Sequence, residues 1–210
     1  MVIGAQELTL RPSGVRWTVP PHAAERADAA SSGMMDRGEL RCLAAAALAF
    51  PWSGAEIVVE IGTYAGETAC FVAETLAEEG HDAVVLSIDP FERVSGTRWN
   101  PQGKYRRYQR AVRSRGLEQR CLPLIAYSQD AAPAVPSRIG LLIVDGNHEL
   151  ESVRRDLELY APKVVPGGIV FMDDYTETYP GVTTATNEFV RTHDAFELLH
   201  QSYFAILQKS

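Results

Sequence analysis

Five short apolar runs, separated by segments long enough for helices, constrain the fold of this chain more than any other feature. They are rich in Val, Ile and Leu and show little polar alternation, which is typical of strands buried on both faces of a parallel sheet. The runs span residues 57–61, 83–89, 121–125, 139–145 and 168–173. Because parallel strands need crossover connections, the pattern predicts an open, doubly wound α/β sheet with helices on both faces.

The alternation breaks near the C-terminus. A helix is expected over residues 184–192, and two strand-like runs follow at residues 196–200 and 203–207. Only Gln201 and Ser202 separate these runs, which is too few residues for a parallel crossover, so we expect an antiparallel hairpin. Together with the five parallel strands, this hairpin predicts a seven-stranded, mostly parallel sheet.

The first 35 residues differ from the rest of the chain. They contain Pro12, Gly14, Pro20 and Pro21 and show no sustained hydrophobic period. We therefore expect a loosely structured arm or lid over residues 1–35, followed by one compact domain over residues 36–210, since a single core serves a chain of this size. The arm could also pack on a second copy of the chain in a homo-oligomer.

Composition and charge exclude several classes of partner. The net charge is −7 and no long basic block occurs, which argues against nucleic acid. No apolar stretch approaches the ~20 residues of a membrane-spanning helix, and the N-terminus lacks a secretory pattern. The three cysteines, Cys42, Cys70 and Cys121, suit neither a disulfide framework nor a zinc site. We therefore expect a cytoplasmic protein that binds neither nucleic acid nor membrane.

A glycine-containing bend follows the first strand, which carries Glu60 near its end. Gly62 and Gly66 let the backbone turn tightly and approach a ligand, and the next helix offers free N–H groups to a carboxylate. Glu60 would suit an ammonium group. Asp89 ends the second strand, where an acidic side chain can accept both hydroxyls of a ribose. Tyr64 stands where the dinucleotide fingerprint needs its second glycine, which argues against an NAD-dependent dehydrogenase.

Acidic side chains also follow the fourth and fifth strands. Asp145 ends the fourth, and Asp173 and Asp174 end the fifth. Adjacent parallel strands lie ~4.8 Å apart, so these carboxylates can converge at one rim. Clustered carboxylates need a neutralising cation, and hard oxygen ligands favour Mg²⁺ or a similar divalent ion. Alternatively, one or two of the aspartates, Asp174 above all, cap a helix or turn.

His148 follows Asp145 by three residues. A histidine titrates near neutral pH, which suits the removal of a hydroxyl proton. Its place beside the expected carboxylate cluster predicts that His148 is a general base, and Asp145 would take part in the same catalytic step. The other histidines have no such neighbours in the pattern.

The bend and the segment after the third strand resemble those of known methyltransferases. Residues 60–68 (EIGTYAGET) resemble the first motif of the catechol, caffeoyl-CoA and macrolide-sugar O-methyltransferases. Residues 126–130 (AYSQD) resemble the adenine-contacting segment of the catechol enzymes. The resemblance covers residues 55–208 and implies a Rossmann-like class I O-methyltransferase that uses S-adenosylmethionine. At the position of His148 the catechol enzymes carry a lysine, and the sugar enzymes a histidine proposed as base.

The resemblance also assigns roles by position. Met34 would cover the cofactor, and the metal triad would be Asp145, Asp173 and Asp174. The first motif and Asp89 would hold the methionine part and the ribose, and residues 128–129 the adenine. The implied cofactor-binding residues are Glu60, Gly62, Tyr64, Gly66, Thr68, Asp89, Ser128 and Gln129.

The expected reaction is methyl transfer from S-adenosylmethionine to a hydroxyl of a small molecule, such as a sugar, a phenol or another natural product. Nitrogen or carbon could replace the acceptor oxygen. Residues 93–105 and 176–182 are expected to shape the acceptor pocket or to form solvated loops. Two other functions stay open: an antibiotic-tailoring protein of the cephalosporin hydroxylase type, and a cofactor-binding module without turnover.

Overall fold

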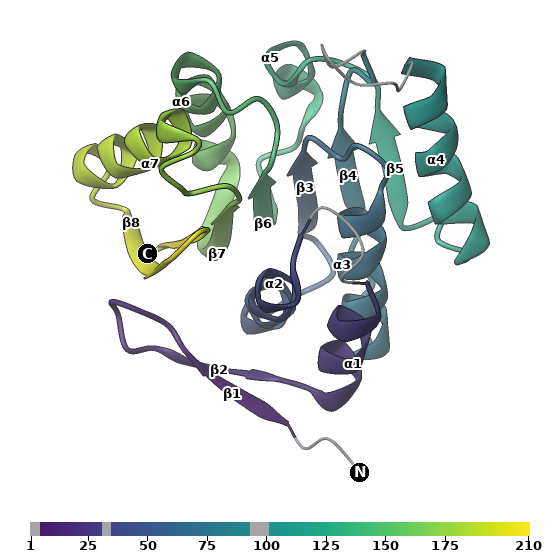
Figure 1. The fold of residues 1–210 in the computed structure, drawn as a ribbon, viewed down its shortest axis with the longest axis horizontal. Helices are drawn as coiled ribbons and strands as arrows, with labels where there is room; N and C mark the ends of the chain where they lie inside the picture. The colour runs from purple at the N-terminus through teal and green to yellow at the C-terminus, as the bar shows by residue number, and fades with distance from the viewer. Residues whose placement is uncertain (1–4, 31–34, 93–100) are drawn as a thin grey trace.

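A central seven-stranded sheet organises the chain (Figure 1). The computed structural model describes residues 5–30, 35–92 and 101–210. The strand order is β5-β4-β3-β6-β7-β9-β8, with β9 antiparallel to both β7 and β8 and the other pairs parallel. The strands are β3 (Ile57–Ile61), β4 (Val85–Ile88), β5 (Cys121–Leu124), β6 (Ile139–Val144), β7 (Val164–Met172), β8 (Phe196–Gln201) and β9 (Ala205–Lys209). The predicted mostly parallel sheet with a C-terminal hairpin is confirmed.

Helices cover both faces of this sheet. They are α1 (Pro21–Ala30), α2 (Arg37–Ala49), α3 (Glu67–Glu78), α4 (Pro101–Ser114), α5 (Ser128–Ala131), α6 (Leu150–Tyr160) and α7 (Pro180–Thr192), with short 3₁₀ turns at Ala132–Ala134 and Ala161–Lys163. None of the described helices is both long and apolar enough to span a bilayer.

Successive residues of the central strands feed two separate cores, because side chains alternate between the faces of a strand. On β6, Leu141 and Ile143 join the core beneath α1 to α4. Their neighbours Leu142 and Val144 join the core beneath α6 and α7. Both faces of the sheet are therefore buried beneath helices, which explains the unbroken apolar runs in the sequence.

The start of β7 differs from expectation. The strand was expected over residues 168–173, but β7 already begins at Val164, shortly after α6 ends at Tyr160. Pro162 cannot continue the α-helix, because it lacks the N–H group and its ring clashes with the preceding turn. Residues 165–168 form an irregularity inside the strand, seen as a shift in its register with β6.

The expectation of a loosely structured arm is wrong for residues 5–30. Strands β1 (Gln6–Thr9) and β2 (Arg16–Val19) form a hairpin, and α1 packs beside α2 and α3. Proline delimits these elements instead of preventing them, since Pro12 lies between the two strands and Pro21 begins α1. The buried face of α1 consists of alanines, which give a weak hydrophobic signal in the sequence.

The connection between β1 and β2 also contacts the edge strand β8. The carbonyl of Arg11 accepts a hydrogen bond of 2.7 Å from the N–H of Gln201. The hydroxyl of Ser13 donates to the carbonyl of Leu199 over 2.8 Å. The N-terminal segment therefore lies against the edge strand β8 of the sheet (Figure 1).

Candidate active site

The glycine bend after β3 lies in direct contact with the loop after β6. Gly62 has a φ of +85°, and a Cβ atom there would stand 2.0 Å from the carbonyl oxygen of Asp145. Ile61 and Asp145 are also joined by a backbone hydrogen bond of 2.9 Å. Only glycine fits this position, so the bend and the first acidic residue form one structural unit.

Asp89 holds the bend from the next strand. Its carboxylate accepts hydrogen bonds from the backbone N–H of Tyr64, at 3.0 Å, and of Phe91, at 2.5 Å. Tyr64 and Phe91 both have positive φ, of 48° and 51°, which non-glycine residues rarely adopt. Asp89 therefore stabilises two strained residues beside the expected ribose position.

The bend has the features that a zwitterionic cofactor needs. Its residues Gly62, Tyr64 and Thr68 are half-buried, so the bend is accessible. Helix α3 begins at Gly66, in the left-handed conformation, without a side-chain cap, so its first N–H groups can take a carboxylate.

Glu60 lies beneath this bend, with only 1 % of its surface exposed. Its Oε2 atom has no hydrogen-bond partner among the described residues. Burial raises the pKa of Glu60 to about 7. A buried carboxyl with an unpaired oxygen fits an ammonium group, which supports a cofactor that carries one.

Helix α6 fixes the expected adenine-binding segment. The hydroxyl of Tyr160 donates to the carbonyl of Ser128 over 2.6 Å. Burial raises the pKa of Asp156 to about 6, and the nearby Ser128 side chain opposes the rise. Ser128 is half-buried, whereas Gln129 is exposed. Asp156 and Tyr160 were missed from the sequence. Their spacing of four residues on one helix face was the available signal.

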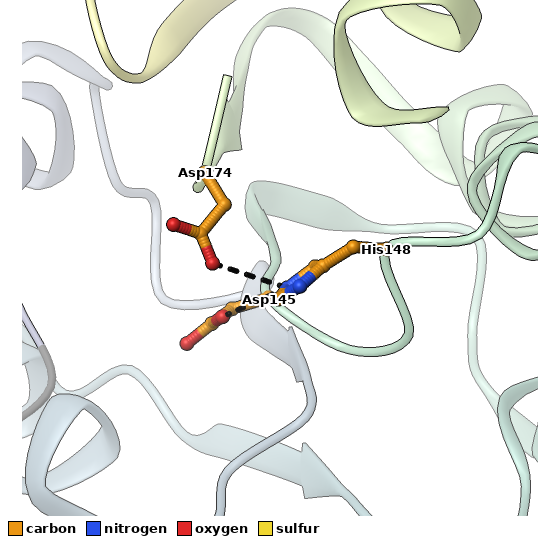
Figure 2. A group of neighbouring side chains, drawn as sticks. All are labelled: Asp145, His148 and Asp174. Carbon is orange, nitrogen blue, oxygen red and sulfur yellow. Dashed lines mark ion pairs between the residues drawn. The ribbon is translucent and has the colours of Figure 1, made fainter. Parts of the chain in front are cut away.

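Asp145, His148 and Asp174 converge at the carboxyl edge of β6 and β7. Figure 2 shows the His148 ring pointing toward both carboxylates. Its Nε2 atom lies 3.3 Å from Asp174 and 3.8 Å from Asp145. One ligand atom from each residue lies within 4.8 Å of the others. Tyr179 packs edge-to-face against the histidine, with ring centroids 4.4 Å apart.

Asp173 lies apart from this group of three. It is buried, and one of its oxygens accepts the N–H of Asp174 over 2.9 Å. Its carboxyl group also lies close enough to Asp145 and Glu39 to raise the pKa of both. Asp174 has a φ of +54°, which turns the chain so that the two adjacent aspartates take different directions. Of the expected triad, two carboxylates thus lie beside His148, and the third, Asp173, is buried near Asp145 without joining them.

Glu39 is a further buried carboxyl group, missed from the sequence. It accepts the N–H of Asp36 over 2.8 Å and completes a capping box at the start of α2. Burial and the neighbouring Asp173 raise the pKa of Glu39 to about 9. The Asp-x-x-Glu pattern at residues 36–39 was the signal for the cap, but nothing in it indicates the contact with Asp173.

The electrostatics of the cluster fit a cation. Burial and the nearby Asp173 raise the pKa of Asp145 well above its ordinary value. The pKa of Asp174 is raised by the same two causes, and His148 opposes the rise. Among the described ion pairs, both aspartates pair with His148 alone. A divalent ion would relieve this repulsion, and the oxygen donors suit Mg²⁺.

A cavity of about 550 Å³ opens beside His148, between the N-terminal ends of α6 and α7. Asn147, Tyr179 and Thr184 contribute to its wall. Residues 178–181 of the expected acceptor segment line it too. Most of the other segment expected to shape the acceptor pocket, residues 93–100, lies outside the described residues, as does Met34.

Comparison with protein families identifies the region that contains this site. A model of the methyltransferase domain matches residues 59–175, from β3 to just beyond β7. The match includes the bend, Asp89, the segment at Ser128 and the acidic cluster. Among curated protein sequences, none matches the chain.

Solved structures share the fold at low sequence identity. The O-methyltransferase NovP is 21 % identical over 85 % of this chain and 82 % of its own, with a TM-score of 0.66. CalS11, a TDP-rhamnose 3′-O-methyltransferase in calicheamicin biosynthesis, is 16 % identical over 89 % of this chain and 93 % of its own, with a TM-score of 0.60. An rRNA methylase from Streptococcus thermophilus is 17 % identical over 78 % of this chain and 90 % of its own, with a TM-score of 0.58.

Proposed function

This chain belongs to the methyltransferase domain family, and from that premise we propose that it transfers a methyl group from S-adenosylmethionine to a hydroxyl group of a small molecule. The observation that carries the proposal is the contact between Gly62 and Asp145. It joins the bend that suits the cofactor to the cluster that suits proton removal. Donor and acceptor can then meet at one edge of the sheet.

The cofactor supplies a methyl group that its sulfonium has already activated. The protein therefore has to align this methyl group with the acceptor oxygen and to exclude water. The bend from Gly62 to Thr68 holds the methionine end, with Glu60 beneath it for the ammonium group. Asp89 binds the ribose hydroxyls. Ser128 and Gln129 bind the adenine, and α6 keeps that segment in place.

His148 removes the proton from the acceptor hydroxyl. The carboxylates of Asp174 and Asp145, 3.3 Å and 3.8 Å from its Nε2 atom, hold the imidazole ring in place. Asp145 and Asp174 would hold a divalent cation, with Asp173 supporting Asp145 from close by, and the bound ion would lower the pKa of an acceptor hydroxyl. Asp145 thus serves both the base and the ion.

The cavity beside His148 receives the acceptor. Its wall combines the ring of Tyr179 with the polar side chains of Asn147 and Thr184, a mixture that suits a hydroxylated ring. NovP and CalS11, which are O-methyltransferases, support oxygen as the acceptor atom. The net charge of −7 and the acidic cluster oppose an rRNA acceptor, since RNA binding draws on Lys and Arg.

The test is methyl transfer from labelled S-adenosylmethionine to a panel of catechols, sugar nucleotides and simple diols. We expect transfer that needs Mg²⁺, stops in chelator and is lost in Asp145→Asn, while S-adenosylhomocysteine still binds that variant. Undiminished transfer in chelator would refute the role of the metal. Tight cofactor binding without transfer to any acceptor would favour a binding module, and a product without an added methyl group would favour the antibiotic-tailoring alternative.

A further inference from the structure

Helix α4 buries a lysine on the face that packs against the domain. Lys104, Tyr108 and Val112 recur every four residues and are all buried. Lys104 keeps only 5 % of its surface exposed. The other basic side chains of the helix point to solvent, as expected for a charged outer face: Arg106, Arg107, Arg110 and Arg113.

The contact of the Lys104 ammonium is an aromatic ring of the glycine bend. Its Nζ atom lies 5.3 Å from the ring centroid of Tyr64. Within the described part of the chain, no carboxylate forms an ion pair with Nζ. A cation over one ring recovers only part of what an ammonium loses when it leaves water. The position therefore suits an anion that the described residues do not provide.

Helix α4 is held against the bend by a second contact of the same face. A Cβ atom at Gly66 would stand 2.6 Å from the ring of Tyr108. Gly66 begins α3, a helix of 12 residues whose N-terminus has no side-chain cap. The uncapped N-terminus of α3 follows Tyr64 in the chain, the ammonium of Lys104 lies over the Tyr64 ring, and both attract negative charge.

We propose that Lys104 binds the carboxylate at the methionine end of the cofactor. The inference rests on the proposed function and adds a residue to it. Lys104 pairs with the carboxylate and Glu60 with the ammonium, so each charge of the zwitterion meets its opposite. The aromatic face of Tyr64 keeps the lysine in place before the cofactor binds.

Two ligands that differ only in this carboxylate test the assignment. S-adenosylhomocysteine carries it, and S-adenosyl-3-thiopropylamine lacks it but keeps the ammonium group. By calorimetry, we expect Lys104→Met to weaken S-adenosylhomocysteine binding about 10- to 100-fold, the usual range for a charged hydrogen bond. The same variant should leave the affinity for the amine within about twofold. Lys104→Arg should restore most of the loss, and Arg110→Met, a control on the exposed face, should change neither affinity.

Unfolding separates recognition from a structural role. Because Lys104→Met removes a buried charge that has no anion beside it, the free variant should resist urea at least as well as the wild type. An equal loss of affinity for both ligands, or an unchanged affinity for S-adenosylhomocysteine, would overturn the assignment. So would a defect confined to the KM of the acceptor, which would place an acceptor anion at Lys104. A wild-type chain that binds neither ligand would instead overturn the proposed function itself.

Discussion

Replacing Gly62 by alanine tests how tightly the cofactor bend and the acidic cluster are joined. The added Cβ would stand 2.0 Å from the carbonyl oxygen of Asp145 and 2.7 Å from the Cα of Gly146, both of them backbone atoms. The alanine would also need a φ of +85°. The substitution therefore adds backbone strain and a steric clash at one position.

Each of these costs has a typical magnitude. A left-handed backbone costs a non-glycine residue about 1–2 kcal/mol, and forcing atoms into a packed region costs about 1–3 kcal/mol more. We expect Gly62→Ala to lose about 2–5 kcal/mol of unfolding free energy. At ~2–4 °C per kcal/mol for a chain of this size, Tm should fall by about 4–20 °C.

Gly80 provides the matched control. It has a φ of +81°, and a Cβ there would meet nothing within 4 Å. Gly80→Ala should therefore lose only the strain, about 1–2 kcal/mol.

Urea unfolding followed by circular dichroism measures both variants, and calorimetry measures S-adenosylhomocysteine binding. We expect weaker S-adenosylhomocysteine binding in Gly62→Ala and unchanged binding in Gly80→Ala. If the two variants lost equal stability, the close approach of the bend to Asp145 would not exist as described.

Three further predictions concern the base, a buried acid and a helix cap. His148→Ala should lower kcat about 100-fold or more with S-adenosylhomocysteine affinity unchanged, and an equal rate would refute the base assignment. Because burial raises the pKa of Glu60 to about 7, the folded chain keeps a proton that the unfolded chain releases near pH 4.5. Glu60 should therefore contribute about 3 kcal/mol to the fall in wild-type stability as pH rises between these values, and urea titrations of Glu60→Gln should show a fall smaller by that amount. Asp36→Ala removes the acceptor for the N–H groups of Gly38 and Glu39 and should cost about 1–2 kcal/mol in thermal unfolding, with Asn as the conservative control.

The sequence predicted the sheet because its strands are apolar on both faces, and three of the five parallel runs end in an aspartate. The same logic placed Asp89, Asp145 and Asp174 at one edge, since the carboxyl ends of parallel strands meet there. It could not give the direction of Asp173. That direction depends on the positive φ of the next residue, which periodicity does not encode.

Other features were missed because their signal was weak or had a second explanation. The hairpin and α1 were hidden by prolines that mark boundaries and by alanines that bury little area. The local sequence pattern explains Glu39 as part of a helix start. Its proximity to Asp173 joins residues far apart in the sequence, which a local pattern does not reveal. Lys104 was hidden in a helix full of arginines, although its spacing of four from Tyr108 marks it as inward-facing.

The N-terminal hairpin has a consequence for solubility. A sheet ends in two strands whose outer backbone groups invite pairing with other chains. On β5, Pro123 removes one of these donors. On β8, the segment between β1 and β2 occupies the outer edge, through the bonds of Arg11 and Ser13. A chain shortened by its first 20 residues would leave β8 open, and we expect it to self-associate through this strand even where the catalytic residues are intact.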